Sequence, residues 1–582
     1  MYRKEAIAAL RDVLKKEDIS AMIIPSNDPH FGEYIPEYYG CRSWLSGFHG
    51  SAGTLVISQK NAALWTDSRY FIQAAKDLDG SEIELMKMRM PGTPSIPDWL
   101  KSHLKAEDIV ALDEDLFTYQ EYEELLDELH PLTATLIEDP FDKIWSDRPP
   151  IQFNPILNMD ETISGESIES KHKRICDTLN APMDFVYIIS ELDEIAWLFN
   201  IRGTDVEYNP LFLSYAIIMK DSLHLFIRKE MLEEAAIKSL STSEVILHDY
   251  EEFTPYLTKL PKNIIRIFSR NKITAKNYLA ALENIHETGP FPSVLPDPTD
   301  GGTISWFKAI KNPIELNGFY QAYWEDAKAW RKLLIYLEEN RDKGINEYQV
   351  GQKLIEFRKE CPDYLGESFQ PIVAYQENAA LPHYAAKDEK SATVLKPKGI
   401  VLIDSGAHYT YGTTDTTRTI PLGEMSQEQK DDYTIALKGT IDLAKFHFVP
   451  GLRGCLLDII ARGPIMNAGR MYYHGTCHGI GHRLCVHEGP QSIRMEENSV
   501  KLHNYMVMSD EPALYVEGKW GIRHENTFII EPWTTTARGQ FCRFKTITKV
   551  PIDERPINFN LLDEDEKKWL KKFNTRDVNR KF

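Results

Sequence analysis

The stretch that decides the fold runs from 399 to 418 and reads GIVLIDSGAHYTYGTTDTTR. Its first five residues are an apolar run that ends at Asp404, as expected for a buried strand that delivers a carboxylate to a cavity. The turn-forming pair Ser405-Gly406 follows, so the chain can return as a hairpin and place Asp415 beside Asp404. The sequence therefore predicts two neighbouring carboxylates at the end of a buried strand.

Three more candidate ligands lie downstream: His478, Glu511 and Glu525. Glu511 comes just beyond a second apolar run, residues 505–508. With the two aspartates, these residues offer four carboxylates and one imidazole. Oxygen-rich ligands suit hard divalent ions, and a carboxylate can bridge two of them, so the set indicates a two-metal hydrolytic site. A cap or turn role explains any one of these residues, but not all five in these contexts.

Glu525 lies in a strand predicted from Gly521 to Ile530. Because side chains alternate along a strand, Arg523 and Glu525 should share one face, while His524 points to the other. We therefore expect His524 to face away from the metals.

The order and spacing of the five candidate ligands resemble the pita-bread metallopeptidases, which include methionine aminopeptidases, prolidases and Xaa-Pro aminopeptidases. Asp415 follows Asp404 by eleven positions, and Glu525 follows Glu511 by fourteen. The chain is most similar to the large, cytosolic-type, three-domain Xaa-Pro aminopeptidases, and the likeness covers nearly its whole length. The other matching segments are IIPS at 23–26, SGFHGSAGT at 46–54, WTDSRY at 65–70, LDEIAWL at 192–198, NIRG at 200–203 and WL at 569–570.

The resemblance implies a role for each ligand. Asp404 would bind one metal ion, and Asp415 and Glu525 would bridge both ions. His478 and Glu511 would complete the other ion, and Glu511 would also move the proton from the attacking water to the leaving nitrogen. The implied cofactor is a pair of divalent ions. Since the ligand set contains no thiolate, manganese is favoured, with zinc or cobalt as alternatives.

Three further histidines match positions that line the substrate side in this family: His383, His474 and His487. The resemblance implies that they hydrogen-bond the scissile carbonyl and the tetrahedral intermediate and stay outside the ligand set. Arg523 is expected to hold a bridging carboxylate in place. The chain departs from the family at Cys477, where glycine is usual, and at His524, where an aliphatic residue is usual.

A length of 582 residues predicts several domains. In the first half, similar strand patterns recur about 160 residues apart, which indicates two related domains in tandem. The expected fold class is α/β (α+β). Its predicted parts are two related α/β domains at 1–150 and 151–310, a pita-bread catalytic domain at 311–535 and a C-terminal extension at 536–582 packed on the catalytic domain.

The composition disfavours several classes of protein. Hydrophobic residues make up 42% of the chain, yet no run approaches the roughly 18 apolar residues of a membrane span. A net charge of −20 repels phosphate backbones, so no nucleic-acid partner is expected. The N-terminus lacks the features of a secretory signal, and seven cysteines without CxxC spacing favour a reducing compartment, the cytoplasm.

The predicted activity is that of a metal-dependent aminopeptidase, which hydrolyses the N-terminal Xaa-Pro bond of peptides with proline at position two through a water activated by two metal ions. The alternative is a prolidase, a dipeptidase with the same metal site, but the extra N-terminal domain favours the aminopeptidase. A metal-free binding relative or a creatinase-type hydrolase should lack some of the five ligands, and none is missing. The resemblance also implies a homodimer formed largely through the catalytic domains.

Overall fold

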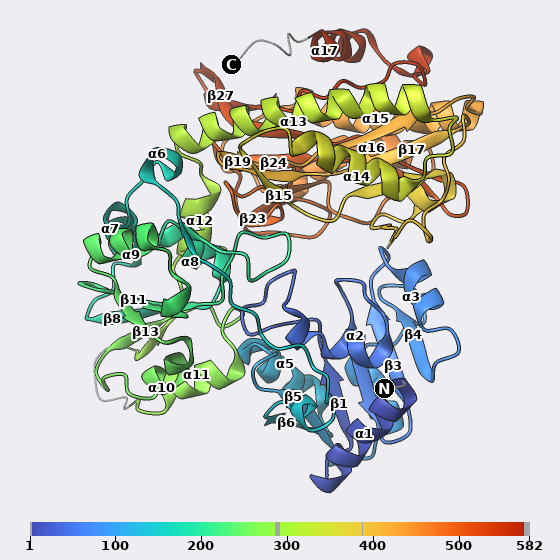
Figure 1. The fold of residues 1–582 in the computed structure, drawn as a ribbon. Helices are drawn as coiled ribbons and strands as arrows, with labels where there is room; N and C mark the ends of the chain where they lie inside the picture. The colour runs from blue at the N-terminus through green and yellow to red at the C-terminus, as the bar shows by residue number, and fades with distance from the viewer. Residues whose placement is uncertain (1–2, 286–291, 387, 576–582) are drawn as a thin grey trace. The chain divides into compact units, whose positions relative to one another are not determined.

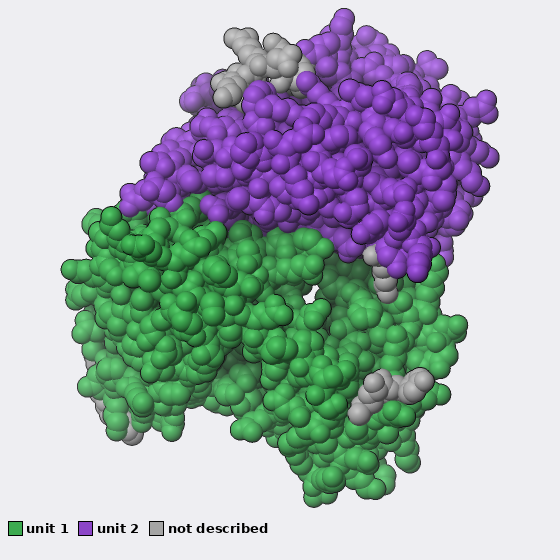
Figure 2. Space-filling model, viewed as in Figure 1, with its two compact units in different colours: residues 1–159, 167–298 green, residues 160–166, 299–582 purple. Residues whose placement is uncertain are grey.

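The computed structural model describes residues 3–285, 292–386 and 388–575. The chain divides into two units, which Figure 2 colours separately. Unit 1 comprises residues 1–159 and 167–298, and unit 2 comprises residues 160–166 and 299–582. Among the described residues, no helix is both long enough and apolar enough to cross a membrane.

Unit 1 contains two six-stranded mixed sheets (Figure 1). The first has the order β4-β3-β2-β1-β5-β6, with β1 (Ala21–Ile24), β2 (Thr54–Ser58), β3 (Ala62–Thr66), β4 (Ile83–Lys87), β5 (Ile109–Asp113) and β6 (Thr133–Ile137). The second has the order β12-β11-β10-β8-β13-β14, with β8 (Phe185–Ile189), β10 (Tyr215–Met219), β11 (Leu223–Phe226), β12 (Ile246–His248), β13 (Ile265–Ile267) and β14 (Val294–Leu295).

The two sheets share one pairing pattern. In the first, β1–β2 and β2–β3 are antiparallel, while β3–β4, β1–β5 and β5–β6 are parallel. In the second, β8–β10 and β10–β11 are antiparallel, while β11–β12, β8–β13 and β13–β14 are parallel. The expectation of two related α/β folds in tandem is confirmed.

Helices cover both faces of these sheets because alternate strand residues point to opposite sides. On β1, Met22 and Ile24 pack with α1 (Arg3–Lys16), whereas Ile23 packs with α4 (Ile96–His103) and α5 (Tyr119–Leu129). The remaining elements of unit 1 with α-helical or short strand structure are α2 (Cys41–Ser46), α3 (Phe71–Asp77), β7 (Leu157–Asn158), α7 (Ile168–Leu179), α8 (Leu192–Leu198), β9 (Ile201–Arg202), α9 (Glu234–Thr242), α10 (Phe253–Leu257) and α11 (Ala275–Leu282).

The two halves of unit 1 are joined by main-chain pairing. Thr118 and Thr274 form an antiparallel bridge. The amide of Tyr119 donates to the carbonyl of Ile273 at 3.2 Å, and the rings of Tyr119 and Tyr278 stack at 3.7 Å. These contacts explain why the two sheets belong to one unit. The finer division into domains at 1–150 and 151–310 stays a prediction.

Unit 2 holds one larger sheet and three small ones. The larger sheet has the order β21-β28-β27-β24-β22-β23, with β21 (His447–Phe448), β22 (Cys477–Gly479), β23 (Glu488–Ile493), β24 (Val507–Asp510), β27 (Asn526–Thr536) and β28 (Gly539–Thr546). The small sheets are β16-β17-β20, β15-β18-β19 and β25-β26, with β15 (Tyr364–Glu367), β16 (Ile372–Tyr375), β17 (Ile400–Asp404), β18 (Ala407–Tyr409), β19 (Gly412–Thr413), β20 (Thr417–Pro421), β25 (Ala513–Val516) and β26 (Trp520–Arg523).

Helices lie against these sheets (Figure 1) and pack on them through apolar side chains. The helices of unit 2 are α6 (Glu161–Ser164), α12 (Thr303–Ala309), α13 (Pro313–Asn340), α14 (Glu347–Arg358), α15 (Gln427–Lys445), α16 (Cys455–Asn467) and α17 (Glu564–Asn574). On β24, Val507 packs with α13, whereas Met508 packs with α15 and α16. At β24, the larger sheet is therefore buried on both faces. Residues 576–582 of the expected C-terminal extension lie outside the described residues.

One predicted element differs. The strand expected from Gly521 to Ile530 is interrupted, because β26 ends at Arg523 and β27 begins at Asn526. The two strands belong to different sheets, and the amide of Glu525 donates to the carbonyl of Thr417 at 3.1 Å. Glu525 therefore lies at the crossing between the sheets. The polar run at 523–527 does not reveal the change of partner strand.

Candidate metal centre

Three overlapping groups of side chains in unit 2 can hold a metal ion. They are Asp404 with Asp415 and Glu525, His478 with Glu511 and Glu525, and Asp415 with His478 and His487. In each group the ligand atoms all lie within 4.8 Å of one another. The structure thus brings all five predicted ligands into one cluster. It also places His487 beside them, although the sequence-based expectation kept that residue outside the ligand set.

Two aspartates come from the hairpin that the sequence predicts. Asp404 is the last residue of β17 and lies opposite Thr417 in the antiparallel pairing of β17 with β20. Asp415 lies just before β20, and its amide donates to the hydroxyl of Tyr323 at 3.0 Å. Tyr323 projects from α13, so this helix fixes the main chain at Asp415.

Ser509 connects the histidine ligand to the glutamate beyond β24. The amide of His478 donates to the Ser509 hydroxyl at 3.0 Å, and that hydroxyl donates to Oε1 of Glu511 at 3.2 Å. The ring of His478 places Nδ1 2.8 Å from the carbonyl of Gly479. A carbonyl only accepts, so Nδ1 carries the proton and the neutral ring presents the lone pair of Nε2. That nitrogen lies 3.3 Å from Glu511 Oε1 and 3.4 Å from Asp415 Oδ2.

Glu525 and Asp404 each keep one oxygen free for a cation. Oε2 of Glu525 accepts from the Thr417 hydroxyl at 2.7 Å, and Oδ2 of Asp404 accepts from Nη2 of Arg523. Their other oxygens, Oε1 and Oδ1, are buried and have no hydrogen-bond partner among the described residues. Buried carboxylate oxygens without a donor are costly unless a cation compensates them.

The electrostatics of the cluster point the same way. Burial raises the pKa of Glu525 well above its ordinary value, and the neighbouring Asp415, Glu511 and Asp404 raise it further. Burial likewise raises the pKa of Glu511 and of Asp404, against the lowering effect of nearby cationic groups. Crowded carboxylates resist ionisation unless positive charge lies between them. The donor set therefore fits divalent cations.

Arg523 holds one carboxylate of the cluster in place, but this carboxylate is not one of the two expected to bridge the metal ions. Its Nη2 donates to Asp404, its Nε donates to the Thr417 hydroxyl at 3.2 Å and its Nη1 donates to the Tyr515 hydroxyl at 2.7 Å. The carboxylate that it holds is thus Asp404 rather than either residue expected to bridge the ions. It is linked to Glu525 through Thr417, which hydrogen-bonds to both side chains. The interruption between β26 and β27 separates Arg523 from Glu525.

The histidines on the substrate side occupy different environments. His474 is engaged at both ring nitrogens, with Nδ1 2.7 Å from the carbonyl of Gly475 and Nε2 2.9 Å from the Tyr515 hydroxyl. Burial lowers its pKa well below the ordinary value, and the nearby Arg523 and His383 act in the same direction. His487 is exposed, and its ring lies 4.5 Å from that of His478. His383 is half-buried and belongs to none of the three groups.

His524 faces away from the cluster, as the strand pattern predicts. Its ring packs against Tyr433 at 4.3 Å, and burial lowers its pKa to about 3. The sequence analysis missed the supporting residues Tyr323, Thr417, Ser509 and Tyr515. Thr417 and Ser509 lie within two positions of a ligand, which was a usable signal, whereas nothing local marks Tyr323.

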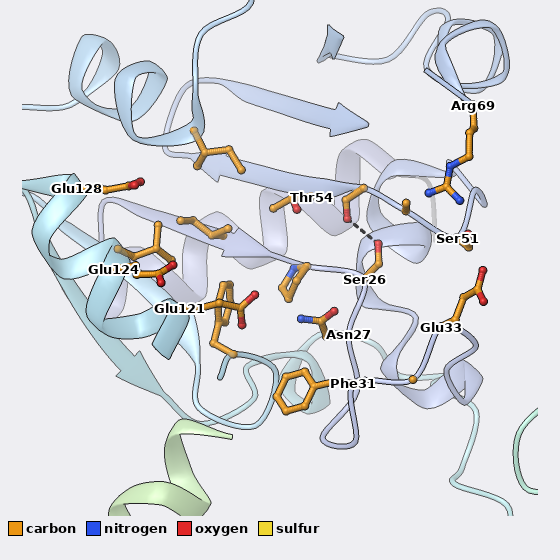
Figure 3. A pocket seen from close by; sticks show the side chains of 18 residues that line it. Ser26, Asn27, Phe31, Glu33, Ser51, Thr54, Arg69, Glu121, Glu124 and Glu128 are labelled. Carbon is orange, nitrogen blue, oxygen red and sulfur yellow. Dashed lines mark hydrogen bonds between the residues drawn. The ribbon is translucent and has the colours of Figure 1, made fainter. Parts of the chain in front are cut away.

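Unit 1 contains a separate cavity of about 610 Å³ (Figure 3). Its lining includes Ser26, Asn27, Glu33 and Arg69, and the Ser26 hydroxyl donates to the carbonyl of Gly53 at 2.6 Å. The three metal-binding groups found among the described residues all belong to unit 2. This cavity is therefore not the metal centre.

Family models match four consecutive regions of the chain. A Creatinase/Prolidase N-terminal domain matches residues 7–143, and a second model with that description matches residues 147–315. Metallopeptidase family M24 matches residues 321–532, and the C-terminal region of peptidase M24 matches residues 540–581. All five predicted ligands fall within the M24 match.

Proteins named as Xaa-Pro or X-prolyl aminopeptidases match nearly the whole chain. A probable Xaa-Pro aminopeptidase P of Coprinopsis cinerea is 36% identical over 97% of this chain and 93% of its own length. Xaa-Pro aminopeptidase 1 of Dictyostelium discoideum is 35% identical over 96% of this chain and 90% of its own length. The crystal structure of an X-prolyl aminopeptidase from Caenorhabditis elegans, described as a cytosolic enzyme with a di-nuclear active site, matches with a TM-score of 0.91 and 31% identity over 98% of this chain and 95% of that one. The chain therefore belongs to the Xaa-Pro aminopeptidase P family of M24 metallopeptidases.

Proposed function

We propose that this protein is an Xaa-Pro aminopeptidase, which removes the first residue of peptides whose second residue is proline. The observation that carries the proposal is the cluster of four buried or half-buried carboxylates and one imidazole. In this cluster, Asp404 and Glu525 each have one buried carboxylate oxygen without a hydrogen-bond partner among the described residues. Side chains arranged in this way bind cations. The full-length similarity to Xaa-Pro aminopeptidases supports the substrate class.

The proposed cofactor is a pair of divalent ions, with manganese as the resident metal. Asp404 would hold one ion, Asp415 and Glu525 would bridge the two, and His478 and Glu511 would hold the other. When bound, such a pair lowers the pKa of a water molecule and polarises the scissile carbonyl. Four carboxylates and one imidazole, without a thiolate, favour manganese over a structural zinc site.

Glu511 is the proposed proton carrier. Its carboxylate can take a proton from the attacking water and pass it to the leaving nitrogen. The scissile bond before proline is a tertiary amide, so its nitrogen carries no hydrogen and must be protonated to leave. Ser509 keeps Glu511 oriented through the bond to Oε1, while Oε2 lies 4.0 Å from Nδ1 of His474.

The substrate-side histidines have distinct proposed roles. His487 is exposed beside His478, so its ring can donate to the scissile carbonyl and to the developing oxyanion. His383 would act on the same side of the substrate. Since Nδ1 of His474 faces a carbonyl, its Nε2 accepts from Tyr515, which in turn accepts from Arg523. His474 therefore shapes the loop before His478 more than it touches substrate.

The proposed assembly is a homodimer formed through unit 2. Helix α16 exposes three apolar side chains, Leu456 at 60%, Ile459 at 55% and Met466 at 49%, and Tyr473 follows at 64% exposure. Ile459 follows Leu456 by three positions and Met466 follows Ile459 by seven, so the three side chains share one face of the helix. Exposed apolar side chains gathered on one helix face are typical of a protein interface. The proposed compartment is the cytoplasm, in agreement with seven unbridged cysteines.

The test couples metal analysis to peptide hydrolysis. We expect two manganese ions per chain, cleavage of Arg-Pro-Pro after the first residue only, and little activity on an Xaa-Pro dipeptide. Comparable kcat/KM on the dipeptide would identify a prolidase instead, and comparable kcat/KM on Ala-Ala-Ala would show that proline is not selected. Full activity with one ion or none per chain would contradict the two-metal centre.

A further inference from the structure

Arg418 on β20 is almost completely buried, at 2% exposure, and is surrounded by uncharged acceptors. Its five hydrogen bonds go to the carbonyls of Thr417 at 2.8 Å, Glu525 at 2.5 Å, Val550 at 2.6 Å and Pro551 at 3.1 Å, and to Oδ1 of Asn526 at 2.8 Å. None of these acceptors is a carboxylate. A buried guanidinium in such a setting loses its hydration without gaining an ion pair, and this costs free energy. A residue that only filled space would not need to carry this charge.

The acceptors belong to two distinct parts of unit 2. Glu525 is a candidate bridging ligand, and Asn526 is the first residue of β27. Val550 and Pro551 follow β28 in the C-terminal extension. One planar, rigid group therefore joins the extension to the main chain of Glu525. The fork geometry of arginine suits such a junction, because several donors act from one fixed plane.

The extension has a defined position of its own. Its apolar residues Ile552, Leu570 and Phe573 are buried in a core that also contains Tyr433 of α15 and Ile400 of β17. The Tyr433 hydroxyl donates to the carbonyl of Asp553 at 2.8 Å. Phe573, on α17, places its ring 5.8 Å from the guanidinium carbon of Arg418. Helix α17 also makes contact with α15.

The position of Glu525 needs such support. Glu525 lies between β26 and β27, so it is not part of either strand and is not paired with neighbouring strands on both sides. Its carboxylate receives one bond, from Thr417, and its other oxygen has no partner in the described part of the chain. A ligand on a crossing segment keeps its geometry only if the main chain there is fixed.

We propose that Arg418 is a positioning residue through which the C-terminal extension fixes the main chain of Glu525 and so sets the affinity of the metal centre. This inference rests on the proposed two-metal site. It assigns the extension a role in metal binding, with Val550, Pro551 and Phe573 acting on Glu525 through Arg418. A purely structural role would lower the stability of the metal-free fold and leave the metal affinity of the folded protein unchanged.

The experiment titrates the metal-free protein with manganese(II) chloride and counts free ions by electron paramagnetic resonance. We expect Arg418→Met to weaken manganese binding by about 10- to 100-fold, the usual effect of removing a residue that orients a ligand. Arg418→Lys keeps the charge but not the fork, so its loss should be intermediate. Arg266 in unit 1 provides a matched control, because it is fully buried and donates to the carbonyls of Ala281 at 2.9 Å and Ile264 at 2.7 Å. Arg266→Met should lower the melting temperature and leave manganese affinity as in the wild type.

A second pair of variants acts from the extension alone. Phe573→Ala removes the ring beneath the guanidinium, and we expect it to weaken manganese binding by a smaller factor than Arg418→Met. Lys568→Ala, on the exposed side of α17, should have no effect, because this side chain pairs with Asp565 on the surface. If Arg418→Met does not fold, Phe573→Ala decides: weaker manganese binding supports the inference and unchanged binding overturns it.

Wild-type protein that binds no manganese would overturn the proposed metal centre together with this inference. Wild-type protein that binds two ions, alongside Arg418 and Phe573 variants that bind them equally well, would overturn the inference alone.

Discussion

Nε2 of His478 lies 3.3 Å from Oε1 of Glu511, although neither atom carries a hydrogen when the imidazole is neutral and the carboxylate is ionised. The lowering effects of burial and of His487 on the pKa of His478 are outweighed by Asp415 and Glu511, so this pKa is raised. A proton or a cation must therefore compensate the two lone pairs. In the proposed centre, a metal ion takes that place.

His478→Ala should lose both metal and activity. The variant removes the only imidazole among the five proposed ligands, and the remaining carboxylates would repel one another more strongly. We expect a clear loss of manganese per chain and hydrolysis near background, measured on the purified, folded protein. A variant that keeps both ions would show that His478 is not a ligand.

His487→Ala and His383→Ala should keep their metals and lose turnover. Removal of one preorganised donor to an oxyanion costs about 10²–10³ in kcat, or roughly 2.7–4 kcal/mol. A residue that binds only the ground state would instead raise KM and spare kcat. His487 also lies in a group with Asp415 and His478, so metal content must be measured beside the kinetics. Loss of metal from His487→Ala would show that His487 is a ligand.

For His474→Ala we expect a smaller effect on kcat, because both of its ring nitrogens bond within the protein.

Stabilisation by manganese should grow with pH. The pKa values of Asp404, Glu511 and Glu525 are raised in the metal-free fold, so this fold binds more protons than the unfolded chain above the ordinary carboxyl range. Stability from these groups is present below the ordinary pKa and is lost as pH rises through the raised values. Manganese binds the ionised form and releases those protons. The melting-temperature gain on adding manganese should therefore be larger at pH 8 than at pH 5.5, and an equal gain at both would contradict this linkage.

Asp28→Asn should stabilise unit 1 at neutral pH. Burial raises the pKa of Asp28 to about 6, from an ordinary value of 3.8, even though backbone amides donate to its carboxylate. Oδ1 accepts from the amides of His30 at 2.9 Å and Gly32 at 3.3 Å, which an asparagine oxygen can also do. The stability contributed by the protonated carboxyl is lost as pH rises through 4 to 6. Two pKa units correspond to about 3 kcal/mol, an upper bound on the gain, because the new amide group also needs a partner. Urea unfolding at pH 4 and pH 7 should show the gain only at pH 7.

Ile459→Asp should separate the proposed dimer. The substitution places a charge within the apolar patch on α16, where an interface would have to desolvate it. We expect a monomer by light scattering at micromolar concentration. Met183→Asp is a matched control, since Met183 is an exposed apolar residue of unit 1. Equal masses for Ile459→Asp and the wild type would exclude this face as the interface.

Local pattern was enough for much of the fold. The apolar run before Asp404 predicts β17, the turn residues predict its return, and the run before Glu511 predicts β24. Each is a short-range signal, because burial and turn chemistry are encoded within a few residues. The five candidate ligands could be proposed for a related reason: a cap or turn role explains any one of them but not the whole set, and their order resembles that of a known family.

Contacts between distant segments could not be read in this way. Arg523 pairs with Asp404, 119 positions away, and Arg418 reaches Val550, 132 positions away. The change of sheet at Glu525 also depends on which strands lie nearby, since residues 523–527 are all polar and show no apolar alternation that would mark the break. Periodicity specifies which face of a segment is buried, but not against what. The sequence by itself thus determined the duplicated sheets and the candidate ligand residues, whereas only tertiary packing decided which groups hold those side chains in place.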